Sequence, residues 1–255
     1  MGFGYRTVGV TCTLALWQGI TAPGWVDPTL LPSPAQVFAT FIELLRHGEY
    51  ILSLVNTLRD VITSFVVGGV LGVTVGLIVG GVRSIEFLVG PYLYSVYSLP
   101  KIAIIPLFVV WLGVGSKTII IVSSIAVGLL VAINTIEGVK SVDPILLRAA
   151  LNLGATRRQI FAKVLLPGAS GLILSGLKLG IGQALITVTA GEIVLSGAGV
   201  GALMWDAQQS LRTDIVFVCL FTLAVIGIVS VWFLELAERS LFPWRASEME
   251  RGLPQ

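Results

Sequence analysis

Long apolar runs separated by short polar segments make up most of the chain. A transmembrane helix needs about 20 mostly apolar residues to cross the hydrocarbon core of a bilayer. Six runs have this character, and the second extends back towards Ile51; they cover residues 5–22, 61–82, 85–112, 119–136, 168–188 and 215–234. The pattern therefore predicts an all-α polytopic membrane protein with about six transmembrane helices.

The third run contains Pro91, Pro100 and Pro106. A proline inside a helix removes a backbone hydrogen bond and clashes with the preceding turn, so it kinks or breaks the helix. We expect this run to be interrupted, and its freed carbonyl groups to line a cavity, because unpaired backbone groups are not tolerated against lipid.

Composition agrees with a chain that lies mainly in lipid. Of the 255 residues, 55% are hydrophobic and 12% are charged, whereas soluble domains carry about 25% charged residues. The net charge of +2 gives no indication of nucleic-acid binding, and no cluster of potential metal ligands stands out. We expect one transmembrane domain over residues 1–255, with neither a metal site nor a nucleic-acid partner.

Residues 23–50 form a polar, proline-marked segment between the first two runs. Ser33-Pro34 is typical of a helix cap followed by the first helical residue, and this helix is expected to end near Arg46. Its apolar residues recur at helical spacing; they are Val37, Phe38, Phe41, Ile42 and Leu45. We expect an amphipathic helix that lies on the membrane face.

Basic residues are divided unevenly between the two sides of the predicted membrane. One side has only Arg46, Lys117 and Arg212, whereas the other has Arg6, Arg83, five basic residues of segment 137–167, Arg239, Arg245 and Arg251. The positive-inside rule predicts that both termini and segment 137–167 are cytoplasmic.

Segment 137–167 carries the main functional signal. Apolar stripes around Leu147 and Phe161 flank Gly154, where the chain is expected to turn. Thr156 and Gln159 have the spacing of a capping box at the start of a second helix. A folded pair of short helices, apolar on one face and basic on the other, favours docking of a soluble partner. An amphipathic hairpin lying against lipid headgroups is the alternative.

Four glycines follow one another at intervals of four residues in the second run: Gly68, Gly72, Gly76 and Gly80. On a helix they form one smooth stripe that lets another backbone approach closely. A second glycine-containing stretch, residues 113–118, is not a phosphate loop, because Ser116 separates its glycine from Lys117. The chain is therefore expected to have no ATPase of its own.

Polar residues inside the apolar runs are costly and suggest function. We predict that Lys178, together with Asn134 and Gln183, contacts a pathway that favours a small anion, and that Glu192 lies near its outer end. A paired lysine, or one that extends its amino group to the headgroups, is the alternative reading of Lys178.

Permeases of ATP-binding-cassette importers carry a cytoplasmic motif: Glu-Ala-Ala, three residues, Gly, nine residues, then Ile-x-Leu-Pro. This chain has the same spacing from Arg148-Ala149-Ala150 through Gly154 to Val164 and Leu166-Pro167. Arg148 replaces the glutamate and Val164 the isoleucine. From about Leu31 to Trp244 the chain resembles permeases of the nitrate, sulfonate and taurine subgroup, with similar text at residues 31–38, 99–117 and 189–201.

The resemblance implies a non-catalytic subunit of a transporter in the bacterial inner membrane. Its partners would be a second permease copy, two ATPase subunits that bind ATP and magnesium, and a periplasmic or lipid-anchored binding protein, while this chain would hold no cofactor. It also implies that segment 137–167 is the coupling loop; the residues carried over are Arg148, Ala149, Ala150, Gly154, Ala155, Arg157, Arg158, Leu166 and Pro167.

The resemblance also implies the substrate class, a small anion such as nitrate, a sulfonate or taurine. Bicarbonate, an aromatic acid and a vitamin precursor are alternatives within the same transporter class. A membrane receptor or assembly factor and an ion-coupled carrier or channel are the alternatives from other classes. An acid chain or filter would be needed for a channel, and only Glu192 and Asp60 are candidates.

Overall fold

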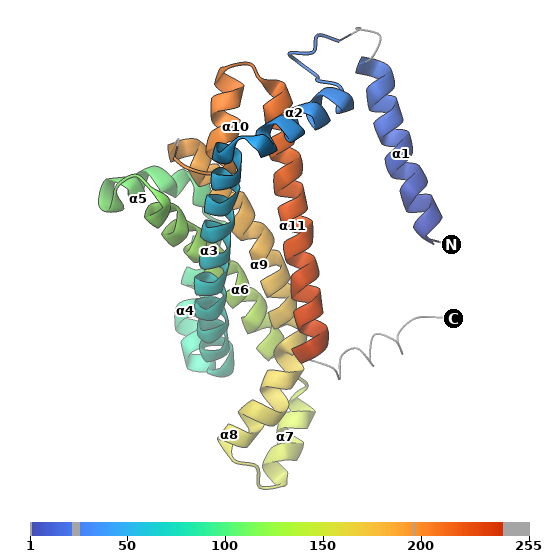
Figure 1. Cartoon of the computed structure of the whole chain (residues 1–255). Coiled ribbons are helices and arrows are strands. Elements are labelled where there is room, and N and C mark those ends of the chain that lie inside the picture. The colour runs from blue at the N-terminus through green and yellow to red at the C-terminus, as the bar shows by residue number, and fades with distance from the viewer. Residues whose placement is uncertain (1, 22–25, 196, 242–255) are drawn as a thin grey trace. The chain divides into compact units, whose positions relative to one another are not determined.

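The computed structural model describes residues 2–21, 26–195 and 197–241, and its described elements are helical (Figure 1). Arg245 and Arg251, which entered the orientation argument, and Trp244 lie outside the described residues. In chain order the elements are α1 (Gly2–Thr21), α2 (Pro34–Arg46), α3 (Gly48–Gly81), α4 (Arg83–Ser98), η1 (Lys101–Ile104), α5 (Ile105–Leu112), α6 (Ser116–Lys140), α7 (Pro144–Asn152), α8 (Arg157–Ile160), η2 (Phe161–Leu165), α9 (Leu166–Leu195), α10 (Val200–Gln209) and α11 (Thr213–Leu241).

Four helical stretches among the described residues are long and apolar enough to cross a membrane: Gly48–Gly81, Ser116–Lys140, Arg157–Leu195 and Thr213–Glu238. A fifth span is possible if the bent pair Arg83–Ser98 and Lys101–Leu112 is counted as one. The described residues therefore provide four candidate spans, or five with the bent pair, and do not confirm the prediction of about six. The first predicted span forms helix α1 but is not among them.

The third predicted span is interrupted as expected, but only one of its three prolines breaks it. The two parts are bent by 89° at the break, where Leu99 is extended ahead of Pro100, the conformation that a following proline favours. Pro106 lies in the first turn of α5, where a missing N–H costs nothing. Pro91 is accommodated inside α4.

The chain divides into two compact units. Unit 1 comprises residues 1–58 and 189–225, and unit 2 comprises residues 59–188 and 226–255. The centre of unit 2 is α6, in which Val122, Ala126, Val127 and Val131 are fully buried.

In unit 2 the glycine stripe of α3 faces α6. A Cβ atom at Gly68 would lie 2.5 Å from the carbonyl oxygen of Ser124, and one at Gly72 would lie 2.6 Å from that of Gly128. At Gly76 the nearest atom would be Cβ of Thr135, at 2.5 Å, and at Gly80 Cβ of Val139, at 3.0 Å. The two backbones therefore approach too closely for any side chain between them.

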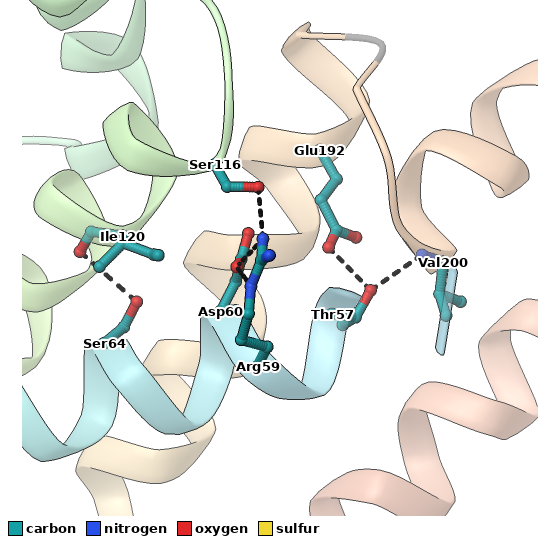
Figure 2. A network of polar contacts seen from close by, with 8 residues as sticks. All are labelled: Thr57, Arg59, Asp60, Ser64, Ser116, Ile120, Glu192 and Val200. Atoms are coloured by element: carbon teal, nitrogen blue, oxygen red, sulfur yellow. Dashed lines mark hydrogen bonds and ion pairs between the residues drawn. The ribbon is translucent and has the colours of Figure 1, made fainter. Parts of the chain in front are cut away.

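Polar contacts tie the same two helices together at the start of α6. The Arg59 guanidinium donates from Nε to Oδ1 of Asp60 and from Nη2 to the Ser116 hydroxyl, and both hydrogen bonds are 2.9 Å long (Figure 2). Asp60 is fully buried and Ser116 is the first residue of α6. Arg59 thus links α3 to α6.

In unit 1 the buried carboxylate of Glu192 anchors the start of α10. It accepts hydrogen bonds from the Thr57 hydroxyl at 2.7 Å and from the Gly201 N–H at 2.8 Å. Thr57 in turn accepts from the Val200 N–H at 2.9 Å (Figure 2). A carboxylate is stabilised at a helix N-terminus, because the unpaired N–H groups there carry partial positive charge.

The glycine before α10 is required by this arrangement. Gly199 has a φ of +142°, and a Cβ there would collide with the Glu192 carboxylate. The turn at Gly199 therefore seats the start of α10 on a buried acid.

Gly72→Val should destabilise unit 2, because the added side chain would separate α3 from α6. We expect a loss of about 1–3 kcal/mol, the usual cost of overpacking, seen as a lower thermal midpoint of the purified chain. Gly182→Val is the matched control, since a Cβ at Gly182 in α9 meets nothing within 4 Å. Equal midpoints for the two variants would contradict the close approach.

Glu192→Ala should destabilise the chain by about 1–3 kcal/mol, because it leaves buried hydrogen-bonding groups of Thr57 and Gly201 unpaired. Glu192→Gln retains an accepting oxygen and should cost less. Thermal unfolding checks both, with Glu49→Gln as a control at an exposed acid of α3. A midpoint for Glu192→Ala as high as that of the control would exclude an anchoring role.

Candidate functional site

The predicted helix pair of segment 137–167 is present, and we refer to residues 144–160 as the helix pair. Helix α7 begins after Asp143, whose carboxylate accepts from the Ile145 N–H at 2.7 Å, and Pro144 occupies its first position. Asparagine, aspartate and serine are the preferred residues for such a cap. Proline fits the first helical position because an N–H there would have no partner within the helix.

Helix α7 ends in the turn that Gly154 was predicted to make. Gly154 has a φ of +78°, its N–H donates to the Leu151 carbonyl at 2.9 Å, and the Ala155 N–H donates to the Ala150 carbonyl at 3.0 Å. These two bonds form a Schellman motif, which pairs the last carbonyls of a helix. A Cβ at Gly154 would meet no atom within 4 Å, so glycine is needed here for its backbone conformation and not for space.

Helix α8 begins with the predicted capping box. The Gln159 N–H donates to the Thr156 hydroxyl at 3.3 Å, and the Thr156 N–H donates back to Oε1 of Gln159 at 2.8 Å. Both ends of the turn between α7 and α8 are therefore closed by hydrogen bonds, and α7 also contacts α8 and η2 directly.

A π-helical turn, η2, joins α8 to α9 immediately before the Leu-Pro end of the motif. The Leu166 N–H donates to the Phe161 carbonyl, five residues back. Pro167 has no N–H to offer the Lys163 carbonyl, and its ring would crowd that carbonyl in an α-helix. A widened turn at this point relieves the conflict, and such turns are frequent at functional sites.

The helix from Arg157 to Leu195 is too long to lie wholly within the hydrocarbon. Its 39 residues extend about 58 Å at 1.5 Å per residue, about twice the 30 Å thickness of the hydrocarbon core. Figure 1 shows α7 and α8 beyond the lower ends of α4 and α6, the neighbouring helices of unit 2. The helix pair therefore extends beyond the neighbouring helices of its unit.

The surface of the helix pair combines apolar and basic side chains. No residue of α7 or α8 is buried; the most exposed apolar residues are Leu153, Ile145, Leu151 and Leu146. Arg148, Arg157 and Arg158 are also exposed, and none of them takes part in an ion pair with another described residue. Exposed apolar side chains surrounded by unpaired charges are typical of a surface that binds another protein.

Two polar contacts connect α6 to α4 in the last turns of α6, just before the helix pair. The Tyr94 hydroxyl donates to Oε1 of Glu137 at 2.8 Å, and Nζ of Lys140 lies 2.9 Å from Oε1 of Glu86. Both pairs are solvent-accessible, so they contribute little to the free energy of folding. Their effect is to link the two helices.

The residues predicted to line a pathway are not brought together at one described pocket. The Asn134 amide donates to the Leu130 carbonyl of its own helix, and the Gln183 amide donates to the Thr187 hydroxyl. Glu192 anchors α10 in unit 1. The pathway role of these residues stays a prediction.

Lys178 is not a lone cation. Its Nζ lies 2.6 Å from Oε2 of Glu238, which is almost fully buried in α11. The structure therefore shows the paired alternative. This partner could not be identified from the sequence, because the two residues are far apart in the chain. Thr57, the partner of Glu192, was missed for the same reason. Among the described residues, no group of three His, Cys, Asp or Glu side chains could hold a metal ion.

Comparison with known proteins agrees with this architecture. An amino acid ABC transporter of known structure superposes with a TM-score of 0.63 at 20% identity, covering 79% of this chain and 98% of the other. The MetNI methionine ABC transporter superposes with a TM-score of 0.60 at 19% identity, covering 76% and 95%. At this identity the likeness shows a shared fold.

Relatives of higher identity cover nearly the whole chain. SsuC of Bacillus subtilis, named for aliphatic sulfonate transport, is 33% identical over 92% of this chain and 85% of its own length. TauC of Escherichia coli, a taurine transport system permease, is 29% identical over 91% and 86%. RibX of Chloroflexus aurantiacus, a riboflavin transport system permease, is 30% identical over 96% and 93%.

The sequence profile of one family matches residues 68–243, which include the whole helix pair. Together with the relatives, this match identifies an ABC transporter permease similar to those named for sulfonate and taurine transport. The chain belongs to the family of binding-protein-dependent transport system inner membrane components.

Proposed function

We propose that this chain forms the translocation pathway of an ATP-driven importer and that its helix pair docks on a separate ATPase subunit. The observation that supports the docking most directly is a helix pair without buried residues at the position of the family motif. Its turn is closed by hydrogen bonds at both ends, so it can transmit force instead of folding away. ATP and magnesium would bind to the partner, and this chain would be non-catalytic.

The exposed side chains suggest what the partner offers. Leu151 and Leu153 need an apolar groove, and Arg148, Arg157 and Arg158 need carboxylates at its rim. Arg148 stands where the motif has glutamate, so the contact at this position should have the opposite sign from that in relatives with the acid. The partner ATPase is expected to present an acidic residue there.

Docking on an ATPase requires the helix pair to lie in the cytoplasm. The basic residues of segment 137–167 support that orientation, which also predicts cytoplasmic termini. The bond pairs Tyr94–Glu137 and Lys140–Glu86 would then carry a displacement of the helix pair through α6 to α4 and the bent span. A rigid-body displacement of this kind is one of the common ways to switch between two conformations.

The remaining partners follow from the same proposal. A second copy of this chain would complete the pathway, two ATPases would receive the two helix pairs, and a periplasmic or lipid-anchored protein would deliver the substrate. We propose a small anion such as a sulfonate or taurine as that substrate, because SsuC and TauC are named for these compounds. A vitamin or vitamin precursor is the alternative substrate, because RibX is named for riboflavin transport.

Leu153→Asp should abolish most ATP-driven uptake without loss of folding, because an exposed apolar contact becomes a desolvated charge at the interface. Buried anchors of this kind contribute about 2 kcal/mol or more to binding, or at least about 30-fold in affinity for the ATPase. Co-purification of the ATPase and uptake of taurine into vesicles measure the effect. Leu30→Asp is the control, because Leu30 is also highly exposed but lies in the segment between α1 and α2.

Gly154→Arg tests the turn itself. Gly113→Arg is its match, since Gly113 has a similar φ of +84° and equally open space around it. We expect loss of ATPase binding only for the change at Gly154. Equal ATPase retention and equal uptake in both variants would mean that the helix pair does not dock, and uptake that continues without any ATPase would favour an ion-coupled carrier or channel.

A further inference from the structure

Helix α2 has two separate apolar flanks, which the sequence pattern had merged into one stripe. On the first flank Val37 is buried, and it packs with Phe41 and Leu44 against Tyr50 and Val218 in unit 1. The second flank consists of Phe38, Ile42 and Leu45, which are 65%, 36% and 41% exposed. Their spacing of four and three residues places them on one side of the helix. This second flank remains exposed in the described part of unit 1.

A third flank of α2 faces a polar groove. Gln36, Ala39 and Glu43 line this groove, which has a volume of about 360 Å³. The opposite wall contains Arg212 and Asp214, whose side chains lie 2.8 Å apart. Hydrogen bonding to Asp214 raises the pKa of the Arg212 guanidinium, so this wall remains charged. The groove is thus a water-facing site, on a different side of α2 from Phe38.

The attachment of α2 to its neighbours is rigid. Only His47 separates it from α3, and the Tyr50 hydroxyl shares a hydrogen bond of 2.5 Å with Thr222 of α11. The Phe41 ring meets the Tyr50 ring edge-on, with centroids 6.3 Å apart, and the Thr40 hydroxyl donates to Asp214. Figure 1 shows α2 lying across the ends of α3 and α11 and not along them. Helices α3 and α11 are long and apolar enough to span a membrane, and a helix lying across their ends is expected to run along the membrane surface.

We infer that the flank of Phe38, Ile42 and Leu45 rests in the lipid headgroup region of the outer leaflet. The 13 residues of α2 measure about 20 Å, too short to cross a bilayer but suited to lying in its interface. The exposed apolar surface continues on the first turns of α3 at Ile51, Leu52 and Val55. Arg46, in the last turn of α2, is exposed and can extend to lipid phosphates.

Lipid contact of α2 is separable from docking of the ATPase, because it depends only on residues of unit 1. It assigns a role to the segment 23–50 that the importer function leaves unexplained. The helix holds the polar groove at the boundary between lipid and water, on the side from which a substrate would arrive under the proposed orientation.

Site-directed spin labelling tests the inference on the full-length chain. Cys12→Ala removes the exposed thiol, while Cys219 is fully buried and can remain. Nitroxide labels at Phe38→Cys and Ile42→Cys probe the lipid flank, and one at Glu43→Cys on the same helix is the matched control. In vesicles of phosphatidylcholine and phosphatidylglycerol, collisions with oxygen and with a water-soluble nickel chelate are measured for each label.

We expect the ratio of oxygen to nickel collisions at positions 38 and 42 to exceed that at 43 by about fivefold, because oxygen concentrates in the apolar layer and the chelate stays in water. Similar ratios at all three positions would place the flank in water and overturn the inference. Immobile labels at 38 and 42 that neither reagent reaches would show a protein on this flank, either a second copy or a binding protein, and would also overturn it.

Discussion

The close approach of α3 and α6 is the constraint on which unit 2 depends. Lipid tails are as apolar as the side chains they would replace, so two helices in a membrane gain little from burying apolar surface against each other. What holds them is contact at short range, and four glycines in α3 permit it against the carbonyl groups and Cβ atoms of α6. Arg59 adds a polar tie at the outset of α6, where the glycine stripe has not yet begun.

Once α6 is fixed, the placement of the exposed helix pair follows. Helix α6 ends at Lys140, and only Ser141, Val142 and Asp143 separate it from α7. Val142 is buried against the position of Gly168 at the start of α9. The two ends of the helix pair therefore join the rest of unit 2 at neighbouring points, near Val142 and Gly168. These contacts hold the base of the helix pair in place.

Helix ends and turns could be predicted from the sequence wherever a single residue type satisfies a specific backbone conformation or hydrogen bond. Ser33 and Thr156 each bond the backbone three residues on, Gly154 supplies a left-handed turn, and Pro100 stops a helix; each appears where expected. Hydropathy located the long helices equally well, because lipid demands about 20 apolar residues whatever the fold. Pro91 was the exception, since α4 continues through it.

Long-range pairing was not readable, and this limited the prediction of the functional residues. The sequence left open whether Lys178 is a lone or a paired cation, because its partner Glu238 is on another helix. Nothing near Glu192 in the sequence indicates that Thr57 and the start of α10 will enclose it. The apolar stripe of α2 likewise gave no sign that Val37 and Phe38, adjacent in sequence, face different surroundings. Such outcomes depend on which helices become neighbours, and periodicity in one segment carries no information on that.

The π-helical turn between α8 and α9 changes the hydrogen-bonding pattern of the long helix at one point along its length. An α-helical N–H bonds the carbonyl four residues back, whereas the Leu166 N–H bonds the Phe161 carbonyl five residues back. Under the proposed docking, a force applied to α8 would reach α9 through this widened turn, where the regular bonding of the flanking helices is interrupted.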